Sequence, residues 1–308
     1  MVGRYRRFPL VELVRCPAMP DRAQRLVPWL VRVLWVALPF TVGPTLADTL
    51  DARSGPVQAL CSVGLWAAWA AGMVASAVPH PVALTVLRVI APAVVAAVVA
   101  AAVSGHESAL AAGWAAMVLA WCFAPAVGAH CVNGPAYPNE RRHLLRAPGP
   151  LLAGPLALAW AIAVGGACAG PLLLAARQWV WGGLATAAGL PLSVVFLRSL
   201  HNLSRRWAVF VPAGLVLHDP LTLLDPILVR RQTIAVLRPA PATSDALDLS
   251  QAAPGLALEM CLTQAVSLTL VQPGRRVGHP QSASKILFTP TRPGAVLDDA
   301  RSRRVRVG

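Results

Sequence analysis

The residues best able to do chemistry lie together in one polar stretch, residues 130–150, which interrupts an otherwise apolar chain. Glu140 or His143 could act as a general base, because a carboxylate or an imidazole can accept a proton from a reacting group. Neighbouring arginines could hold a phosphate or a carboxylate through paired hydrogen bonds. A membrane enzyme or transporter built on this stretch would use its polar residues, Asn133, Tyr137, Asn139, Glu140, Arg141, Arg142 and His143.

The same stretch has a simpler interpretation as a polar turn between two membrane helices. The segments 133–135 (NGP) and 137–139 (YPN) are typical of turns, and Tyr137 suits a membrane interface. The arginines would then mark the cytoplasmic side of the membrane. We favour this interpretation, and we keep the enzyme or transporter as the alternative.

Other patterns give little support to catalysis. The pairs His201-Asn202 and His218-Asp219 lack partners at metal-ligand spacing, and the six cysteines form no C-x-x-C motif. The sequence contains no G-x-S-x-G elbow, no Walker A loop and no G-x-G-x-x-G loop. We therefore expect no catalytic residue, no metal and no cofactor, and we favour a protein that is not an enzyme.

Composition indicates a membrane protein. A soluble domain is about 45–50% apolar and about 25% charged, whereas this chain is 56% hydrophobic and 13% charged. The formal net charge is +14, and Lys285 is the single lysine among 27 basic residues. Such a bias towards arginine, alanine, glycine and proline suggests a bacterial source. We attribute the basic charge to membrane topology, and we expect no nucleic-acid partner.

The polar stretch must be positioned by membrane helices, because apolar segments of about 20 residues flank it on both sides. Six such segments are predicted, over residues 27–47, 58–78, 82–103, 109–128, 151–174 and 179–197. None of them contains Asp or Glu, which disfavours a coupled transporter. The fifth segment holds a G-x-x-x-G match, Gly166 to Gly170. We interpret that match as packing within the chain, not as a dimer motif.

Orientation follows from the arginines, since cytoplasmic loops carry an excess of basic residues. With a cytoplasmic N-terminus, the arginine-rich tail 1–26 and loop 130–150 lie inside, and the external connections hold only Arg53 and Arg177. The division is then a tail (1–26), four spans (27–129), a cytoplasmic loop (130–150), a transmembrane hairpin (151–200) and a cytoplasmic domain (201–308). Both termini face the cytoplasm, in the inner membrane of a bacterium.

The pattern of the C-terminal third predicts a small α+β domain that is mostly β. Strands are predicted at 207–211, 215–218, 227–230, 233–237, 256–262, 266–271 and 286–288, with a loop over 272–284. A helix over 295–304 would follow, with Thr291 as its N-cap residue. The fold class is thus a membrane bundle of about six helices with a C-terminal cytoplasmic α+β domain.

The order WAVFVPAGLVLHD, ILVRRQTIAVL, LALEMCLT with SLTLV, and ILFTPTRPGAVLDDARSRR resembles bacterial pleckstrin-homology-like domains. The resemblance implies a bent β-sheet domain that is closed by one C-terminal helix and attached to membrane helices. The whole chain also resembles uncharacterised multi-pass membrane proteins of actinobacteria, particularly at VNGPAYPNERR and RRWAVFVPAGLVLHDP. That second resemblance implies a membrane setting and no activity.

The favoured function is a polytopic membrane protein that presents a small cytoplasmic interaction or scaffold domain. Its expected partners are the bilayer, anionic lipid headgroups and another membrane or cytoplasmic protein. Contact with a headgroup or a partner is assigned to five arginines, Arg141, Arg142, Arg146, Arg205 and Arg206. We also expect the loop 130–150 to meet the C-terminal domain, through Glu140 and either Arg205 or Arg206.

Overall fold

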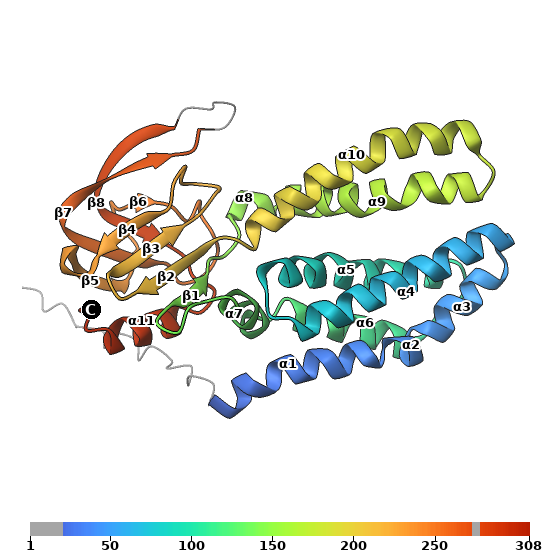
Figure 1. Cartoon of the computed structure of the whole chain (residues 1–308), viewed down its shortest axis with the longest axis horizontal. Coiled ribbons are helices and arrows are strands. Elements are labelled where there is room, and N and C mark those ends of the chain that lie inside the picture. The colour runs from blue at the N-terminus through green and yellow to red at the C-terminus, as the bar shows by residue number, and fades with distance from the viewer. Residues whose placement is uncertain (1–20, 273–277) are drawn as a thin grey trace, which may run out of the picture.

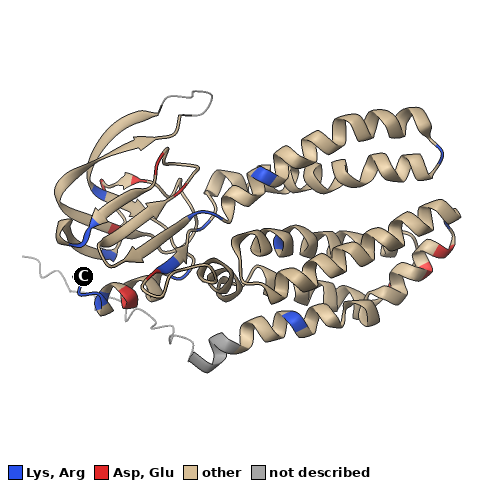
Figure 2. Cartoon of the chain, in the orientation of Figure 1, with Lys and Arg blue, Asp and Glu red and all other residues tan. Residues whose placement is uncertain are grey.

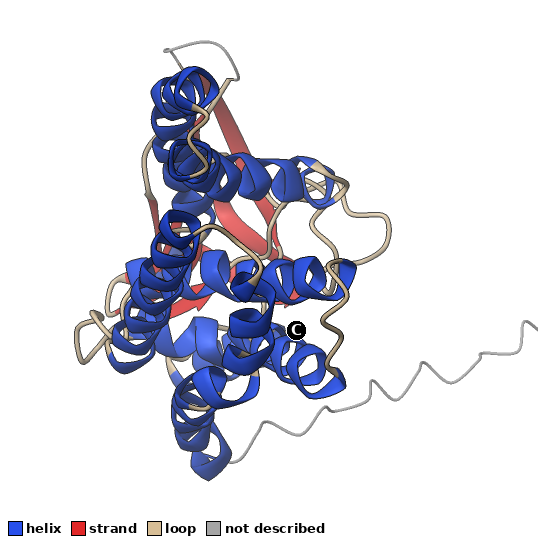
Figure 3. Ribbon diagram, turned by 90° about the vertical axis from the view of Figure 1, so that its right-hand side faces the viewer, coloured by secondary structure: helices blue, strands red, loops and turns tan. Residues whose placement is uncertain are grey.

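The computed structural model describes residues 21–272 and 278–308. It has two parts, a bundle of long apolar helices and a β-domain at one end of that bundle (Figure 1). Viewed from the end of the bundle remote from the β-domain, the helices lie in front and the strands behind them (Figure 3). The basic tail predicted over residues 1–26 lies, as far as residue 20, outside the described residues.

The first apolar segment, predicted as one span over residues 27–47, is a helix broken into three pieces. It consists of α1 (Asp21–Val36), α2 (Leu38–Thr41) and α3 (Gly43–Asp51). Proline causes the first break, because Pro39 has no N–H to donate to the carbonyl of Trp35. The indole Nε1 of Trp69 donates to that carbonyl instead, at 3.0 Å.

Within the described residues, four helices are long and apolar enough to cross a membrane. These are α4 (Gly55–Ala77), α5 (Pro81–Val103), α9 (Pro155–Ala175) and α10 (Trp179–Leu203). A fifth span results if α6 (Ala109–Cys122) and α7 (Pro125–Asn133), which are bent by 51°, count as one. The bend falls at Pro125, which cannot continue the hydrogen bonding of α6. The structure therefore has four or five candidate membrane spans by length and composition, as expected of a membrane protein.

Small residues let the helices pack closely. Trp35 is fully buried and fills a slot above Gly72, where an added Cβ would lie 2.0 Å from the indole ring. In the hairpin of α9 and α10, a Cβ on Gly166 would lie 2.7 Å from the carbonyl oxygen of Gly189. A Cβ on Gly170 would lie 2.3 Å from the hydroxyl oxygen of Thr186. The G-x-x-x-G match is thus confirmed as a packing motif within the chain.

The β-domain contains two four-stranded sheets. The first has the order β1 (Arg141–Leu144), β2 (Trp207–Val211), β3 (Gly214–His218) and β4 (Ile227–Arg230). The second has the order β5 (Ile234–Pro239), β7 (Leu258–Leu270), β8 (His279–Phe288) and β6 (Leu247–Asp248). All neighbouring strands are antiparallel except β6 and β8. The helix α11 (Pro293–Ser302) follows.

Several of the predicted elements need correction. The two strands predicted over 256–271 are the single strand β7, with an irregularity in its pairing between Cys261 and Val266. The loop predicted over 272–284 gives way to β8 from His279 onwards. Thr291 is not the N-cap of α11, because Arg292 holds that position without a side-chain cap. The backbone N–H of Thr291 donates instead to the carbonyl of Leu144, at 2.8 Å.

The largest correction concerns residues 130–150, which are more than a turn. After α7 ends at Asn133, the chain forms β1 and then the short helix α8 (Gly149–Leu152) before it enters α9. The strand β1 pairs with β2 from Arg141 opposite Phe210 to Leu144 opposite Trp207. The β-domain therefore begins inside the helical part, and a boundary at residue 201 omits one of its strands.

Candidate functional site

The candidate site lies where β1 joins the two parts of the molecule. Side chains alternate between the faces of a strand, and consecutive residues of this segment belong to different cores. Leu144 is buried in the core of the helices, with Trp207 packed against the same core. Leu145 is buried in the core of the β-domain together with Ala208 and Phe210. The segment is thus shared by both cores.

Asn133 fastens the end of α7 to β1. Its side-chain nitrogen donates to the carbonyl of Arg142 at 2.8 Å, and its side-chain oxygen accepts from the N–H of Arg142 at 2.9 Å. The same nitrogen donates to the carbonyl of Ala129 at 2.8 Å. The amide therefore takes the place of a strand partner on the free edge of β1, which is a structural role.

Glu140 contacts Arg142, not Arg205 or Arg206. Its Oε2 accepts from the guanidinium of Arg142 at 3.3 Å, and that guanidinium lies 5.4 Å from the ring centre of Trp207. The predicted meeting of the loop with the C-terminal domain is present, since β1 pairs with β2. The residues proposed to make that contact were wrong.

His143 faces α11, away from Glu140. Its Nε2 lies 2.7 Å from Oδ2 of Asp299, and its ring packs edge-on against Phe210. Partial burial raises the pKa of Asp299, but the hydrogen bond from His143 and the nearby positive charges outweigh this effect and lower that pKa. The two candidate bases, Glu140 and His143, thus engage different partners and do not converge on one reacting atom.

The other two loop candidates are exposed. Tyr137 has 73% of its surface exposed. Asn139 is exposed as well, and its contribution is a backbone carbonyl that accepts from the guanidinium of Arg303 at 2.9 Å. Arg303 directly follows α11, and Asp299 lies within it. The bond from Arg303 to Asn139 and the bond between His143 and Asp299 therefore hold the loop against this helix at two points.

The five arginines assigned to lipid or partner contact are dispersed. Arg206 is buried, and it donates to both carboxylate oxygens of Asp219 at 2.7 and 2.6 Å and to the carbonyl of Arg146 at 2.6 Å. It is therefore unavailable to a headgroup. Arg142 and Arg146 are half-buried, whereas Arg141 and Arg205 are exposed. Asp219 has no signal in the sequence beyond its place beside His218, because its partner Arg206 lies 13 residues earlier, in the connection between α10 and β2.

The two exposed arginines do not form one site. Arg205 lies in the short connection between α10 and β2, whereas Arg141 pairs with Phe210 near the far end of β2. At about 3.3 Å per residue, five residues of strand separate them by roughly 15 Å. A single headgroup cannot bridge that distance. Charged residues gather in the β-domain and near the helix ends, and most of the helical part is uncharged (Figure 2).

A small basic pocket lies at the end of β2 remote from α10. It has a volume of about 170 Å³, with Phe210, Pro212 and Val305 among its apolar residues and Arg231 and Arg303 as its charged ones. The guanidinium of Arg303 lies 5.8 Å from the ring centre of Phe210 and is held by the carbonyl of Asn139. A fixed guanidinium beside an apolar floor suits a carboxylate on an otherwise apolar segment.

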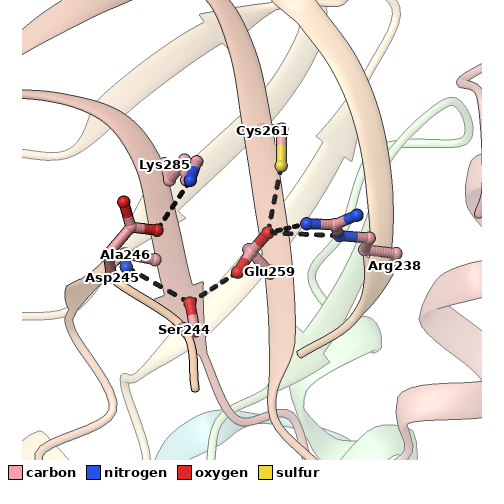
Figure 4. Close-up of polar contacts among 7 residues, drawn as sticks. All are labelled: Arg238, Ser244, Asp245, Ala246, Glu259, Cys261 and Lys285. Carbon is pink, nitrogen blue, oxygen red and sulfur yellow. Dashed lines mark hydrogen bonds and ion pairs between the residues drawn. The ribbon is translucent and has the colours of Figure 1, made fainter. Parts of the chain in front are cut away.

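Figure 4 shows a second polar cluster, around Glu259 on β7, which the sequence analysis missed. Glu259 is buried and accepts hydrogen bonds from Arg238 on β5, Ser244 and Cys261. The bond from Ser244 outweighs the effect of burial and, with the one from Arg238, lowers the pKa of Glu259 to about 2. Burial raises the pKa of the Cys261 thiol. This cluster anchors the segment between β5 and β7, and its thiol is a poor nucleophile.

No group of three or more His, Cys, Asp or Glu side chains suited to a metal ion occurs among residues 21–272 and 278–308. Comparisons with models of protein families, with curated proteins and with solved structures returned no match for this chain.

Proposed function

We propose that the protein is a membrane-anchored interaction module, whose helices hold the β-domain in a fixed position at the membrane surface. One observation carries this proposal. The first sheet takes its edge strand β1 from the connection between α7 and α9, and its next strand β2 follows α10 directly. The β-domain is therefore attached to the helices at two points. A domain that only needed tethering would require one linker.

The buried ion pair reinforces the second attachment. Arg206 lies three residues after the end of α10, and it bonds to Asp219 beyond β3 and to the carbonyl of Arg146 between β1 and α8. A buried charge that loses its partner costs about 3–5 kcal/mol, so both connections are held in one arrangement. A movement of the helices would accordingly be transmitted to the sheet.

We propose about six spans with both termini in the cytoplasm of a bacterium. The broken helix α1–α3 would form the first span, because it runs from the β-domain end of the bundle to the remote end (Figure 1). The bent pair α6 and α7 would form the fourth span. Arg205 is exposed beside the end of α10, where a cytoplasmic arginine can attract anionic lipid by about 1 kcal/mol.

The pocket around Arg231 and Arg303 is the proposed contact with a partner protein. It lies at the end of β2 remote from α10 and offers two guanidinium groups beside apolar residues. The partner would present an acidic residue on an otherwise apolar segment. Electrostatic attraction of this kind gives specificity and faster association more than raw affinity.

The test is site-specific photo-crosslinking in intact cells, with a photoreactive residue at the exposed position Ala213 in the β2–β3 turn. One discrete adduct is expected, and Arg231→Glu should abolish it. Arg230→Glu is the matched control, because Arg230 is equally exposed but does not line the pocket. An adduct that survives Arg231→Glu, or that is lost equally with Arg230→Glu, would refute a specific contact at this pocket.

A further inference from the structure

The helical part contains an apolar cavity of about 340 Å³. It is bounded by the broken segment α2–α3 on one side and by α4 and α5 on the other, with Trp35 and Trp69 also contributing. Of the described residues that line it, Ser62 is the only one with a hydroxyl group, and none is charged. An apolar cavity of about 150 Å³ is large enough to bind benzene, so this cavity can accept a larger apolar group.

Hydrogen bonds from three tryptophan side chains hold the helices around the cavity in place. The indoles of Trp35 and Trp69 donate to each other's carbonyl oxygens, at 2.9 and 3.0 Å. Trp114 donates to the carbonyl of Leu34 at 2.9 Å. These bonds fix the end of α1 against α4 and α6 at the point where the helix breaks. The chain then resumes as α2 and α3, and the space between them and α4 stays open.

The cavity opens on the outer face of the apolar helices, which a bilayer would surround. Trp66 and Leu65 on α4 line it and are 58% and 39% exposed. Ala47 on α3 is also exposed at the cavity. Water is a poor occupant, because a buried water needs about two to four polar partners. Both indole N–H groups in the floor already donate to carbonyl oxygens. Hydrocarbon from the bilayer is the group that can enter.

The charges beside the cavity indicate the kind of lipid. The cavity reaches Leu50 in the last turn of α3, next to Asp51, and Arg53 follows in the connection to α4. Asp48, Asp51 and Arg53 are all exposed. A zwitterionic headgroup can place its ammonium near the carboxylates and its phosphate near Arg53. An anionic headgroup would meet more negative than positive charge.

We propose that this cavity binds one acyl chain of a zwitterionic phospholipid, from the leaflet remote from the β-domain. The chain enters between α3 and α4 past Trp66. The bound chain fills the space left by the break in the first helix, and it is a structural lipid of the bundle. This assignment is independent of the partner contact proposed for the β-domain.

The experiment uses the full-length protein in vesicles that contain phosphatidylethanolamine with a diazirine in one acyl chain. After irradiation, labelled peptides are mapped by mass spectrometry. The label should be enriched at least several-fold on the cavity residues Leu46, Leu65 and Ile90 over the exposed residues Val180 and Leu184 of α10. Equal labelling of the two groups would show ordinary annular lipid and overturn the proposal.

A pair of glycine variants gives the matched test. A Cβ added at Gly43 or at Gly64 meets no atom within 4 Å, but only Gly43 lines the cavity. Gly43→Leu should reduce labelling of the cavity residues several-fold, and Gly64→Leu should leave it unchanged. If Gly43→Leu fails to fold, Ala97→Leu places a side chain in the same cavity from α5. Undiminished labelling in a folded cavity variant would contradict the proposal. Equal labelling by a phosphatidylglycerol probe would contradict the headgroup assignment.

Discussion

The side chain of Asn133 makes two hydrogen bonds with the backbone of Arg142, one to its carbonyl at 2.8 Å and one from its N–H at 2.9 Å. Asn133 is the last residue of α7, and Arg142 lies in the middle of the edge strand β1. Asn133, which the sequence offers as a candidate site residue, thus links a membrane helix to a sheet through hydrogen bonds.

Replacing Asn133 by alanine should destabilise the junction. The variant leaves the N–H and the carbonyl of Arg142 without this partner, and an unsatisfied buried group costs about 1–3 kcal/mol. We expect the free energy of unfolding in detergent to fall by about 2 kcal/mol. Asn139→Ala is the control, because Asn139 is exposed and contributes its backbone carbonyl. If Asn133→Ala were as stable as this control, the hydrogen bonds of Asn133 would not stabilise the junction between α7 and β1.

A fragment of residues 201–308 should fold poorly on its own. It lacks β1, so β2 becomes an unpaired edge, and it lacks Leu145, which is buried in the core of the β-domain. Removing a buried leucine side chain costs about 2–5 kcal/mol. Fusing residues 139–147 to the fragment through a flexible linker should restore a cooperative thermal transition in circular dichroism. The fragment alone should lack one, and a cooperative transition there would show that β1 is dispensable.

The ion pair of Arg206 and Asp219 can be tested by a double-mutant cycle. Arg206→Met leaves a buried carboxylate unpaired and should lower the free energy of unfolding by about 3–5 kcal/mol. Asp219→Leu should do the same, and it also removes the acceptor of the Leu221 N–H, at 3.1 Å. The double variant should lose less than the sum of the single losses. Strictly additive losses would mean that the pair is not coupled.

Acid should destabilise the β-domain through Glu259. Its pKa is lowered to about 2 in the folded protein, against about 4.3 for an unfolded glutamate. A lowered pKa means that the unfolded chain binds the proton more tightly, so this stabilisation is complete above about pH 5 and is lost as the pH falls towards 2. Glu259→Gln should be less stable at pH 7 and should lose less stability between pH 5 and pH 2. The free energy of unfolding would be measured by chemical denaturation at each pH. An equal loss between pH 5 and pH 2 in Glu259→Gln and in the original protein would argue against the assignment.

Much of the β-domain could be predicted from local pattern. The runs at Trp207–Val211 and Ile227–Arg230 coincide with β2 and β4, because β-branched and apolar residues there lie between clear turn signals. The apolar helices were equally visible from their length. Pro39 and Pro44 mark where the first segment can kink, but its hydropathy is continuous across them, so its division into three separate helices could not be predicted.

The role of the polar stretch could not be predicted. The strand β1 is only four residues long, and the pattern RRHL has no clear alternation of its own. It becomes a strand because β2 offers an edge, and β2 is more than 60 residues further along the chain. The partners of His143 and Arg206, which are Asp299 and Asp219, are likewise defined by the tertiary fold.

The most direct measurement asks whether β1 pairs with β2 in the membrane. Arg142 and Val209 lie opposite each other in the register, so their side chains share one face of the sheet, whereas Ala208 points to the other face. In a cysteine-free full-length protein, Arg142→Cys with Val209→Cys should form a disulfide rapidly under mild oxidation. Arg142→Cys with Ala208→Cys should not. Equal cross-linking of the two pairs, or none with Val209→Cys, would contradict the account that the loop between the helices is the edge strand of the β-domain.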